Sequence, residues 1–287
     1  MGLPITPELV TRVADELGEG GWRFSLRQLY YAVCAEAEIP PTHAAANGEI
    51  GLGAVLVLVA LILIRFRVVF AALVGLGAVL ILAGVVQRLT SRPPAGRVLA
   101  LSYEEFQSRF GGLKLDSLIG VDASPQAQTE APASVVVCDT AENARVLAAN
   151  LAKAGLDRVV PVDADSLPTP IPWPAVAAFH DASPRGCALP LDLHDAGVDV
   201  VDCGLRPAWV DAPTSQVLEG APARMPRELR PVLDDDEISW LASGRRVELA
   251  TLPPARQMAL LKAALAGGPE RLPGIRVFEP DDSGRLP

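Results

Sequence analysis

The chain has 287 residues and a formal net charge of -9, and half of its residues are hydrophobic although only 5% are aromatic. This negative charge argues against sequence-independent binding of nucleic acid, which relies on clustered Lys and Arg. A local basic patch is still compatible with the composition. Four cysteines show no spacing typical of a disulfide framework or a zinc site, which favours free, buried thiols in a reducing compartment. They are Cys34, Cys138, Cys187 and Cys203.

Residues 1–48 predict a short helical segment. Thr6 is a suitable N-cap, with Pro7 at the first helical position, and a hydrophobic stripe follows. Ser25 and Gln28 have the spacing of a capping box, which begins a second helix that Pro40 stops. The two helices resemble half of a helix-turn-helix unit.

Residues 49–87 predict a transmembrane helical hairpin. Two charge-free runs, which would be roughly 22 and 28 Å long as helices, flank Arg65-Phe66-Arg67. One continuous spanning helix would place both arginines in mid-bilayer, at a cost of about 2.5 to 3.5 kcal/mol each. A hairpin places them at a headgroup layer instead. The alternative is a hairpin buried inside a soluble fold.

The hairpin predicts the localisation and one partner. We expect a multi-pass protein of the cell membrane, in contact with the lipid bilayer. Arginines in the turn and after the second helix give a narrow positive-inside bias, which favours cytoplasmic termini.

The rest of the chain predicts a linker and amphipathic lead-in at 88–133, an α/β domain at 134–266 and a loose tail at 267–287. Short apolar runs alternate with helical patterns, which is typical of a mostly parallel sheet covered on both faces. Strands are expected at 134–138, 158–162, 176–179 and 198–201, with a short one at 247–250. Helices are expected at 141–154, 184–196 (interrupted by Pro190), 233–243 and 254–266.

Several acidic residues follow the predicted strands. Asp139, the pair His180-Asp181, and Asp202 each come at a strand end, as do Asp163 and Asp165. Ligands of such sheets bind outside the carboxyl ends of the strands, and converging carboxylates can hold Mg²⁺. The alternative is that each Asp is a loop residue or a helix cap.

The segment Ser25 to Tyr31, SLRQLYY, resembles the motif of the topoisomerase VI A subunit and related recombination endonucleases. This resemblance implies a winged-helix-like unit in which Tyr31 is the nucleophile that attacks DNA and Arg27 is its basic neighbour. The alternative is that Tyr30 and Tyr31 are one packing residue and one rim residue.

The segment Asp181 to Gly186, DASPRG, resembles the D-x-D-x-x-G motif of toprim domains, and Asp139 takes the place of the family's Glu. The resemblance implies a toprim-like sheet with Asp139 and Asp181 as Mg²⁺ ligands. A Rossmann-like sheet is the alternative. The strand-end positions and this motif together predict a ligand site at His180, Ser183, Gly186 and Asp202. Ser183 replaces the second Asp, which removes a carboxylate from the metal site and weakens it.

Two functional hypotheses follow. The first is a non-catalytic membrane protein whose acidic cytosolic domain binds a protein partner or a small ligand. The second is a membrane-tethered, Mg²⁺-dependent nucleic-acid enzyme of toprim type that uses Tyr31, Asp139 and Asp181.

Overall fold

A computed structural model describes residues 4–37, 76, 78–82, 99, 101–120, 134–209, 216–266, 270–272 and 275–277. The chain divides into two compact units, one formed by residues 1 and 39–95 and the other by residues 2–38 and 96–287. The predicted hairpin therefore lies outside the described residues, except for one short helical stretch. No helix within the described ranges is both long and apolar enough to cross a bilayer.

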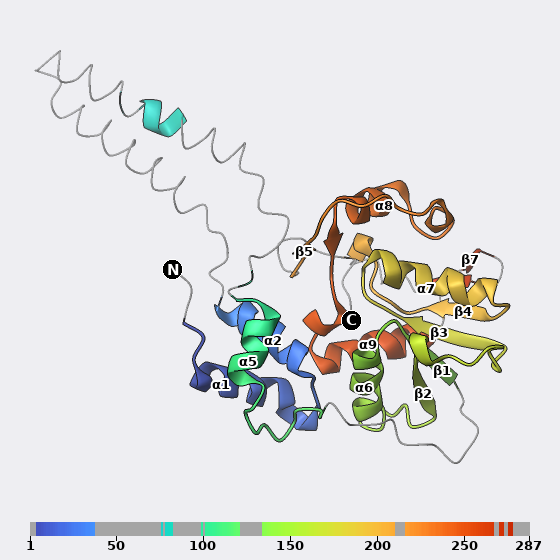
Figure 1. Ribbon diagram of the computed structural model, residues 1–287, viewed down its shortest axis with the longest axis horizontal. Coiled ribbons are helices and arrows are strands. Elements are labelled where there is room, and N and C mark those ends of the chain that lie inside the picture. Colours follow the sequence, from blue (N-terminus) through green and yellow to red (C-terminus); the bar gives the residue numbers. More distant parts are fainter. Residues whose placement is uncertain are drawn as a thin grey trace, which may run out of the picture. The chain divides into compact units, whose positions relative to one another are not determined.

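In the second unit, three helices form what we call the helical module: α1 (Pro7–Gly18), α2 (Leu26–Ala37) and α5 (Tyr103–Phe110) (Figure 1). Both predicted caps are confirmed. The Thr6 hydroxyl accepts a hydrogen bond from the Leu9 amide at 3.3 Å. Ser25 and Gln28 form a reciprocal capping box, with distances of 2.9 and 3.2 Å.

The core of the helical module joins segments from both sides of the predicted hairpin. Phe106 of α5 is fully buried in the same cluster as Leu29 and Val33 of α2. A parallel bridge between Phe24 and Leu118 adds two backbone hydrogen bonds of 2.9 and 3.0 Å. The predicted boundary at residue 48 therefore separates helices that share one hydrophobic core.

The α/β domain contains the predicted parallel sheet, whose strand order is β2-β1-β3-β4-β8-β7. Strands β1 to β4 are confirmed within one or two residues, and all of their pairings are parallel. The segment predicted as a loose tail differs, because β8 pairs in parallel with β4 and β7 adds an antiparallel edge. The strands are β1 (Ser134–Cys138), β2 (Val159–Asp163), β3 (Ala175–Phe179), β4 (Asp199–Asp202), β7 (Glu270–Leu272) and β8 (Ile275–Val277).

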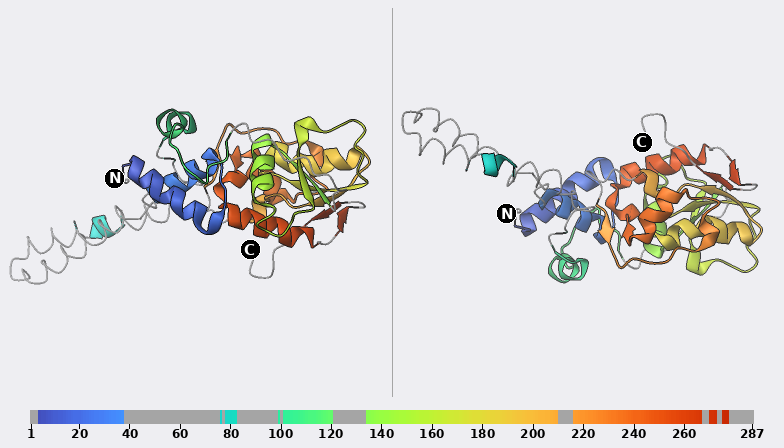
Figure 2. Two further views of the ribbon diagram at one scale, coloured as in Figure 1. Left: turned by 90° about the horizontal axis from the view of Figure 1, so that it is seen from below. Right: turned by 90° about the horizontal axis from the view of Figure 1, so that it is seen from above.

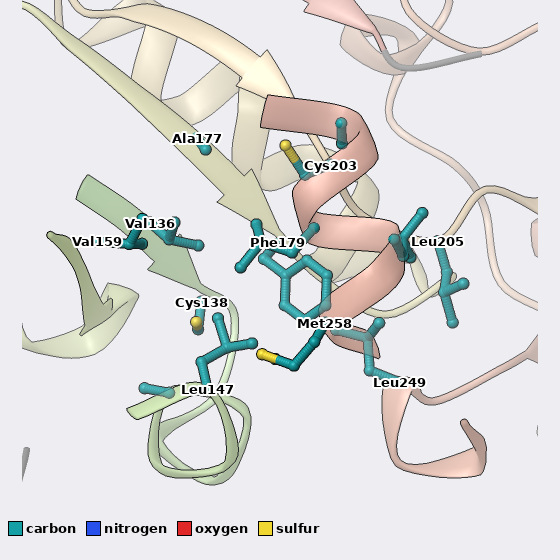
Figure 3. Close-up of a cluster of buried hydrophobic side chains, with 14 of the residues drawn as sticks. Val136, Cys138, Leu147, Val159, Ala177, Phe179, Cys203, Leu205, Leu249 and Met258 are labelled. Carbon is teal, nitrogen blue, oxygen red and sulfur yellow. The ribbon is translucent and has the colours of Figure 1, made fainter. Parts of the chain in front are cut away.

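Helices cover both faces of the sheet, and side chains alternate between the two faces along each strand. Figure 2 shows helices on both sides of the sheet. Val136 and Phe179 pack against α6 (Ala141–Asn150) and α9 (Pro254–Leu265), as Figure 3 shows. Their neighbours along the strands pack on the opposite face against α7 (Pro184–Asp195). The apolar runs of the strands follow from this double coverage.

Two local predictions differ from the structure. Helix α7 continues through Pro190 rather than being interrupted there. The strand expected at 247–250 lies earlier, at β6 (Arg245–Arg246), which pairs antiparallel with β5 (Leu218–Glu219). Residues 247–252, which we call the strap, are instead held by contacts with the rim of the sheet: Val247 and Ala182 exchange backbone hydrogen bonds of 2.9 and 3.0 Å.

A buried ion pair fixes α8 (Asp235–Ala242) to the loop after β4. The Arg206 guanidinium donates to both carboxylate oxygens of Glu237, and it also donates to the Val232 carbonyl at 2.8 Å. The Arg206 and Glu237 side chains are only 6% and 2% exposed. Glu237 is also the capping-box partner of Asp234, so one carboxylate serves both the helix cap and the ion pair.

Candidate functional site

Asp139 and Asp181 lie side by side at the carboxyl ends of β1 and β3, as the sequence predicts for neighbouring parallel strands. One oxygen of Asp139 accepts a hydrogen bond from the Asp181 amide at 2.9 Å. The other accepts from the Asn143 side chain at 2.8 Å. Asn143 is in the first turn of α6, which starts directly after β1, so the pair is positioned by one strand-to-helix turn.

The strap closes this site from the other side. The Leu249 amide donates to Asp181 at 2.7 Å, and the Asn143 amide group makes a longer contact of 3.4 Å with the same oxygen. Three of the four oxygens of the Asp139–Asp181 pair therefore accept hydrogen bonds from the protein.

His180 is buried and is held at both ring nitrogens. Nε2 lies 3.0 Å from Asp202 Oδ1, and Nδ1 lies 2.9 Å from the Asp181 carbonyl oxygen. The Asp181 carbonyl and an ionised Asp202 are both acceptors, so this geometry assigns a hydrogen to each ring nitrogen, which makes the ring an imidazolium. Burial lowers the pKa of His180, but the charge of Asp202 and its hydrogen bond raise it more, to about 9.

Gly204 packs directly against this imidazolium. Three ring atoms of His180 occupy the space where a Cβ at residue 204 would lie, and the Gly204 amide donates to Asp202 at 3.0 Å. The absence of a side chain at residue 204 is therefore what allows the ion pair to be buried here.

Ser183 and Gly186, both predicted to bind a ligand, have structural roles here. The Ser183 hydroxyl is the N-cap of α7 and accepts a hydrogen bond from the Gly186 amide at 3.0 Å. A Cβ at residue 186 would overlap the Asp181 carbonyl and approach Asp139, so glycine lets the start of α7 sit against the carboxylate pair.

The tyrosine motif faces the same rim. Arg27 of α2 pairs with Glu248 of the strap at 3.0 Å and with Glu142 of α6 at 3.4 Å. The Tyr31 side chain is buried, and burial, followed by the charge of Glu248, raises the pKa of its phenol well above its usual value. Such a phenol is a poor nucleophile near neutral pH, because its phenolate is disfavoured.

The Tyr30 side chain packs as a core residue. Its hydroxyl donates to the Leu101 carbonyl at 2.8 Å, and its ring makes an edge-on contact with Tyr103 and a tilted contact with Phe106. The two adjacent tyrosines therefore belong to the interior of the helical module, and Tyr31 is the one that faces Glu248.

Burial, together with the charge of Asp139, raises the pKa of Asp181 to about 7 from its ordinary value of 3.8. Between about pH 4 and 7 the folded chain therefore keeps a proton that the unfolded chain releases, so stability falls as the pH rises. His180 acts in the same direction, since its contribution is complete below pH 6.5 and is lost as the pH rises through 9.

We therefore expect the free energy of unfolding to fall between pH 5 and pH 7, and the Asp181→Asn variant to flatten that part of the profile. Asparagine keeps the acceptor for the Leu249 amide but does not ionise. Pulse proteolysis in urea at several pH values measures the profile, with Asp165→Asn at the exposed rim as the control. An unchanged slope in Asp181→Asn would contradict the assignment.

The described residues contain no group of three or more His, Cys, Asp or Glu side chains arranged to hold a metal ion. Asp139 and Asp181 are close together, and three of their four oxygens accept hydrogen bonds from the protein, whereas His180 as an imidazolium has no lone pair to offer. The pair supplies two carboxylates, and no third ionisable ligand joins them among the described residues.

Asn143, Glu142 and Glu248 are site residues that sequence reasoning missed. Asn143 carries a usable signal, since it lies four residues after Asp139, in the first turn of a predicted helix. Glu248 carries no such signal, because its position depends on the fold of the strap.

Comparison with protein-family models, with curated proteins and with solved structures finds no match for this chain.

Proposed function

We propose that this protein is a membrane-anchored protein whose α/β domain is non-catalytic and binds a partner or a small ligand. The observation that carries the proposal is the hydrogen-bonded state of the Asp139–Asp181 pair, whose oxygens hold Asn143 and the strap in place. These carboxylates hold three segments together, which is a structural role, and two carboxylates without a third ionisable ligand among the described residues make a weak site for a divalent ion. Ser183, as a helix cap, fits the same interpretation.

The anchor is supported by the one helical stretch described within the apolar run. Leu76, Val79 and Leu82 follow one another at three-residue intervals and are 52%, 62% and 63% exposed. Large apolar side chains exposed in a row indicate a surface that another apolar phase covers. We propose that this phase is the cell membrane, crossed by a hairpin with both termini in the cytoplasm.

The full-length chain should sediment with membranes and stay there after an alkaline carbonate wash. A variant with Leu76→Asp, Val79→Asp and Leu82→Asp should be released, because each charge at the bilayer centre costs about 2.5 to 3.5 kcal/mol. The matched control places Asp at three exposed positions of the other unit, Thr11, Gln107 and Ser239. A monomeric, detergent-free wild-type chain in the supernatant would overturn the anchor.

A second candidate is a toprim-type nucleic-acid enzyme, which would make the sheet toprim-like rather than Rossmann-like. The observation that favours it is the convergence of the two motifs: Arg27 pairs with Glu248, and the next residue, Leu249, donates its amide to Asp181. In this alternative Mg²⁺ binds at Asp139 and Asp181, and Tyr31 attacks the nucleic acid.

A plasmid assay separates the two candidates. We expect purified full-length protein to leave supercoiled DNA unchanged in the presence of Mg²⁺, because the Tyr31 phenol is buried beside a carboxylate. Gel electrophoresis after incubation measures relaxation and cleavage. Activity that disappears in both Tyr31→Phe and Asp181→Ala would establish the enzyme instead.

A further inference from the structure

A groove of about 490 Å³ lies on the helical module, away from the carboxylate pair. Val13 and Leu17 of α1, Ala32 of α2 and the Trp22 side chain form its apolar part, and Pro253, just before α9, closes one end. This volume is in the range of specific binding pockets.

Among the described residues that line the groove, the ionisable side chains are three carboxylates: Glu16, Glu19 and Glu36. They are exposed and belong to α1, to the turn after it and to α2. These three carboxylates outnumber Arg12 and Lys153, the two cations described at the border of the groove, so this surface offers no excess positive charge to phosphate groups although the helix pair resembles half of a helix-turn-helix unit.

Two cations of the chain already contact the edges of the groove. Arg12 lies 3.3 Å from Glu16 and 3.1 Å from Glu36. The Lys153 ammonium lies 4.9 Å from the centre of the Trp22 ring and donates to the Gly20 carbonyl. The surface therefore attracts basic side chains at two separate points of its border.

We propose that this groove binds a basic amphipathic helix of a partner protein, with apolar side chains inserted between α1 and α2 and Lys or Arg residues on the surrounding carboxylates. An apolar stripe between basic flanks matches both properties of the groove, and helix-in-groove binding is a common mode of peptide recognition. The inference deepens the proposed function by naming the surface and the chemistry of the partner.

The probe is a fluorescein-labelled, 14-residue synthetic helix with Leu on one face and Lys on the other. We expect it to bind the full chain in phosphatidylcholine nanodiscs, as measured by fluorescence polarisation after subtraction of empty discs. Glu19→Lys combined with Glu36→Lys should weaken binding at least tenfold. The double variant Glu104→Lys and Glu228→Lys makes the same net charge change at exposed residues that do not line the groove, and should change binding less than twofold.

A second, uncharged variant keeps the test independent of electrostatics. Ala255→Trp, at the start of α9, fills the groove and should also weaken binding at least tenfold, whereas Ala223→Trp at an exposed loop should not. Equal loss in the groove and control variants, or wild-type binding no greater than to empty discs, would overturn the proposal. The membrane anchor is tested separately by carbonate extraction, so either proposal can fail while the other stands.

Discussion

Replacing Arg206 by alanine should lower the free energy of unfolding by about 3 to 5 kcal/mol, which is the cost of leaving one member of a buried ion pair without its partner. Glu237 would keep its charge in a nearly inaccessible position, with only backbone amides to satisfy it. Because Glu237 also caps α8, we expect this helix to lose protection first. Hydrogen exchange of α8 and pulse proteolysis in urea measure the two effects.

The control is an exposed arginine of the same domain. Arg185 pairs with Asp165 at 2.6 Å, but both side chains are 69% exposed. Exposed ion pairs contribute about 0 to 1 kcal/mol, so Arg185→Ala should change stability little. If both variants lowered the free energy of unfolding by similar amounts, burial would not be what makes the Arg206–Glu237 pair stabilising.

The second large effect is expected from Gly204→Ala. The added methyl group would overlap the His180 ring, which cannot move without losing its hydrogen bond to Asp202 or to the Asp181 carbonyl. Overpacking costs about 1 to 3 kcal/mol, and a displaced buried imidazolium adds to that cost, so we expect a loss of about 3 kcal/mol or more.

Gly112→Ala is the matched control, since nothing lies within 4 Å of its Cβ position and its φ is not positive. This variant should keep wild-type stability within about 0.5 kcal/mol. The Cε1 and Nε2 signals of His180 in NMR report the mechanism directly. A Gly204→Ala protein with an unshifted imidazolium signal and normal stability would contradict the packing argument.

The strand positions of the α/β domain could be predicted because apolar runs such as Ser134–Cys138 are bounded by polar residues and separated by helical patterns. The capping residues Thr6 and Ser25 could be predicted equally well, since each caps its helix through a hydrogen bond to a residue three positions away. Strands β7 and β8 escaped prediction because each is only three residues long and is specified by pairing with an existing sheet edge rather than by its own sequence.

At the candidate site, the approach of Asp139 to Asp181 followed from sheet topology, which places the ends of neighbouring parallel strands at one edge. The role of the strap could not be predicted in this way, because the contacts of Glu248 and Leu249 connect residues more than sixty positions apart. The helical module shows the same limit: α5 resembled a lead-in to the next domain, and only the shared core with α2 reveals its place.

The division of the helical module also sets an order of events during synthesis. Helices α1 and α2 leave the ribosome first, but Phe106 and Phe110, which complete their core, follow more than sixty residues later. At typical elongation rates this delay is roughly 4 to 15 s, far longer than helix formation itself. During that interval the apolar side of the helix pair is not yet packed against Phe106 and Phe110. We therefore expect chaperones to bind nascent chains that are stalled before residue 110.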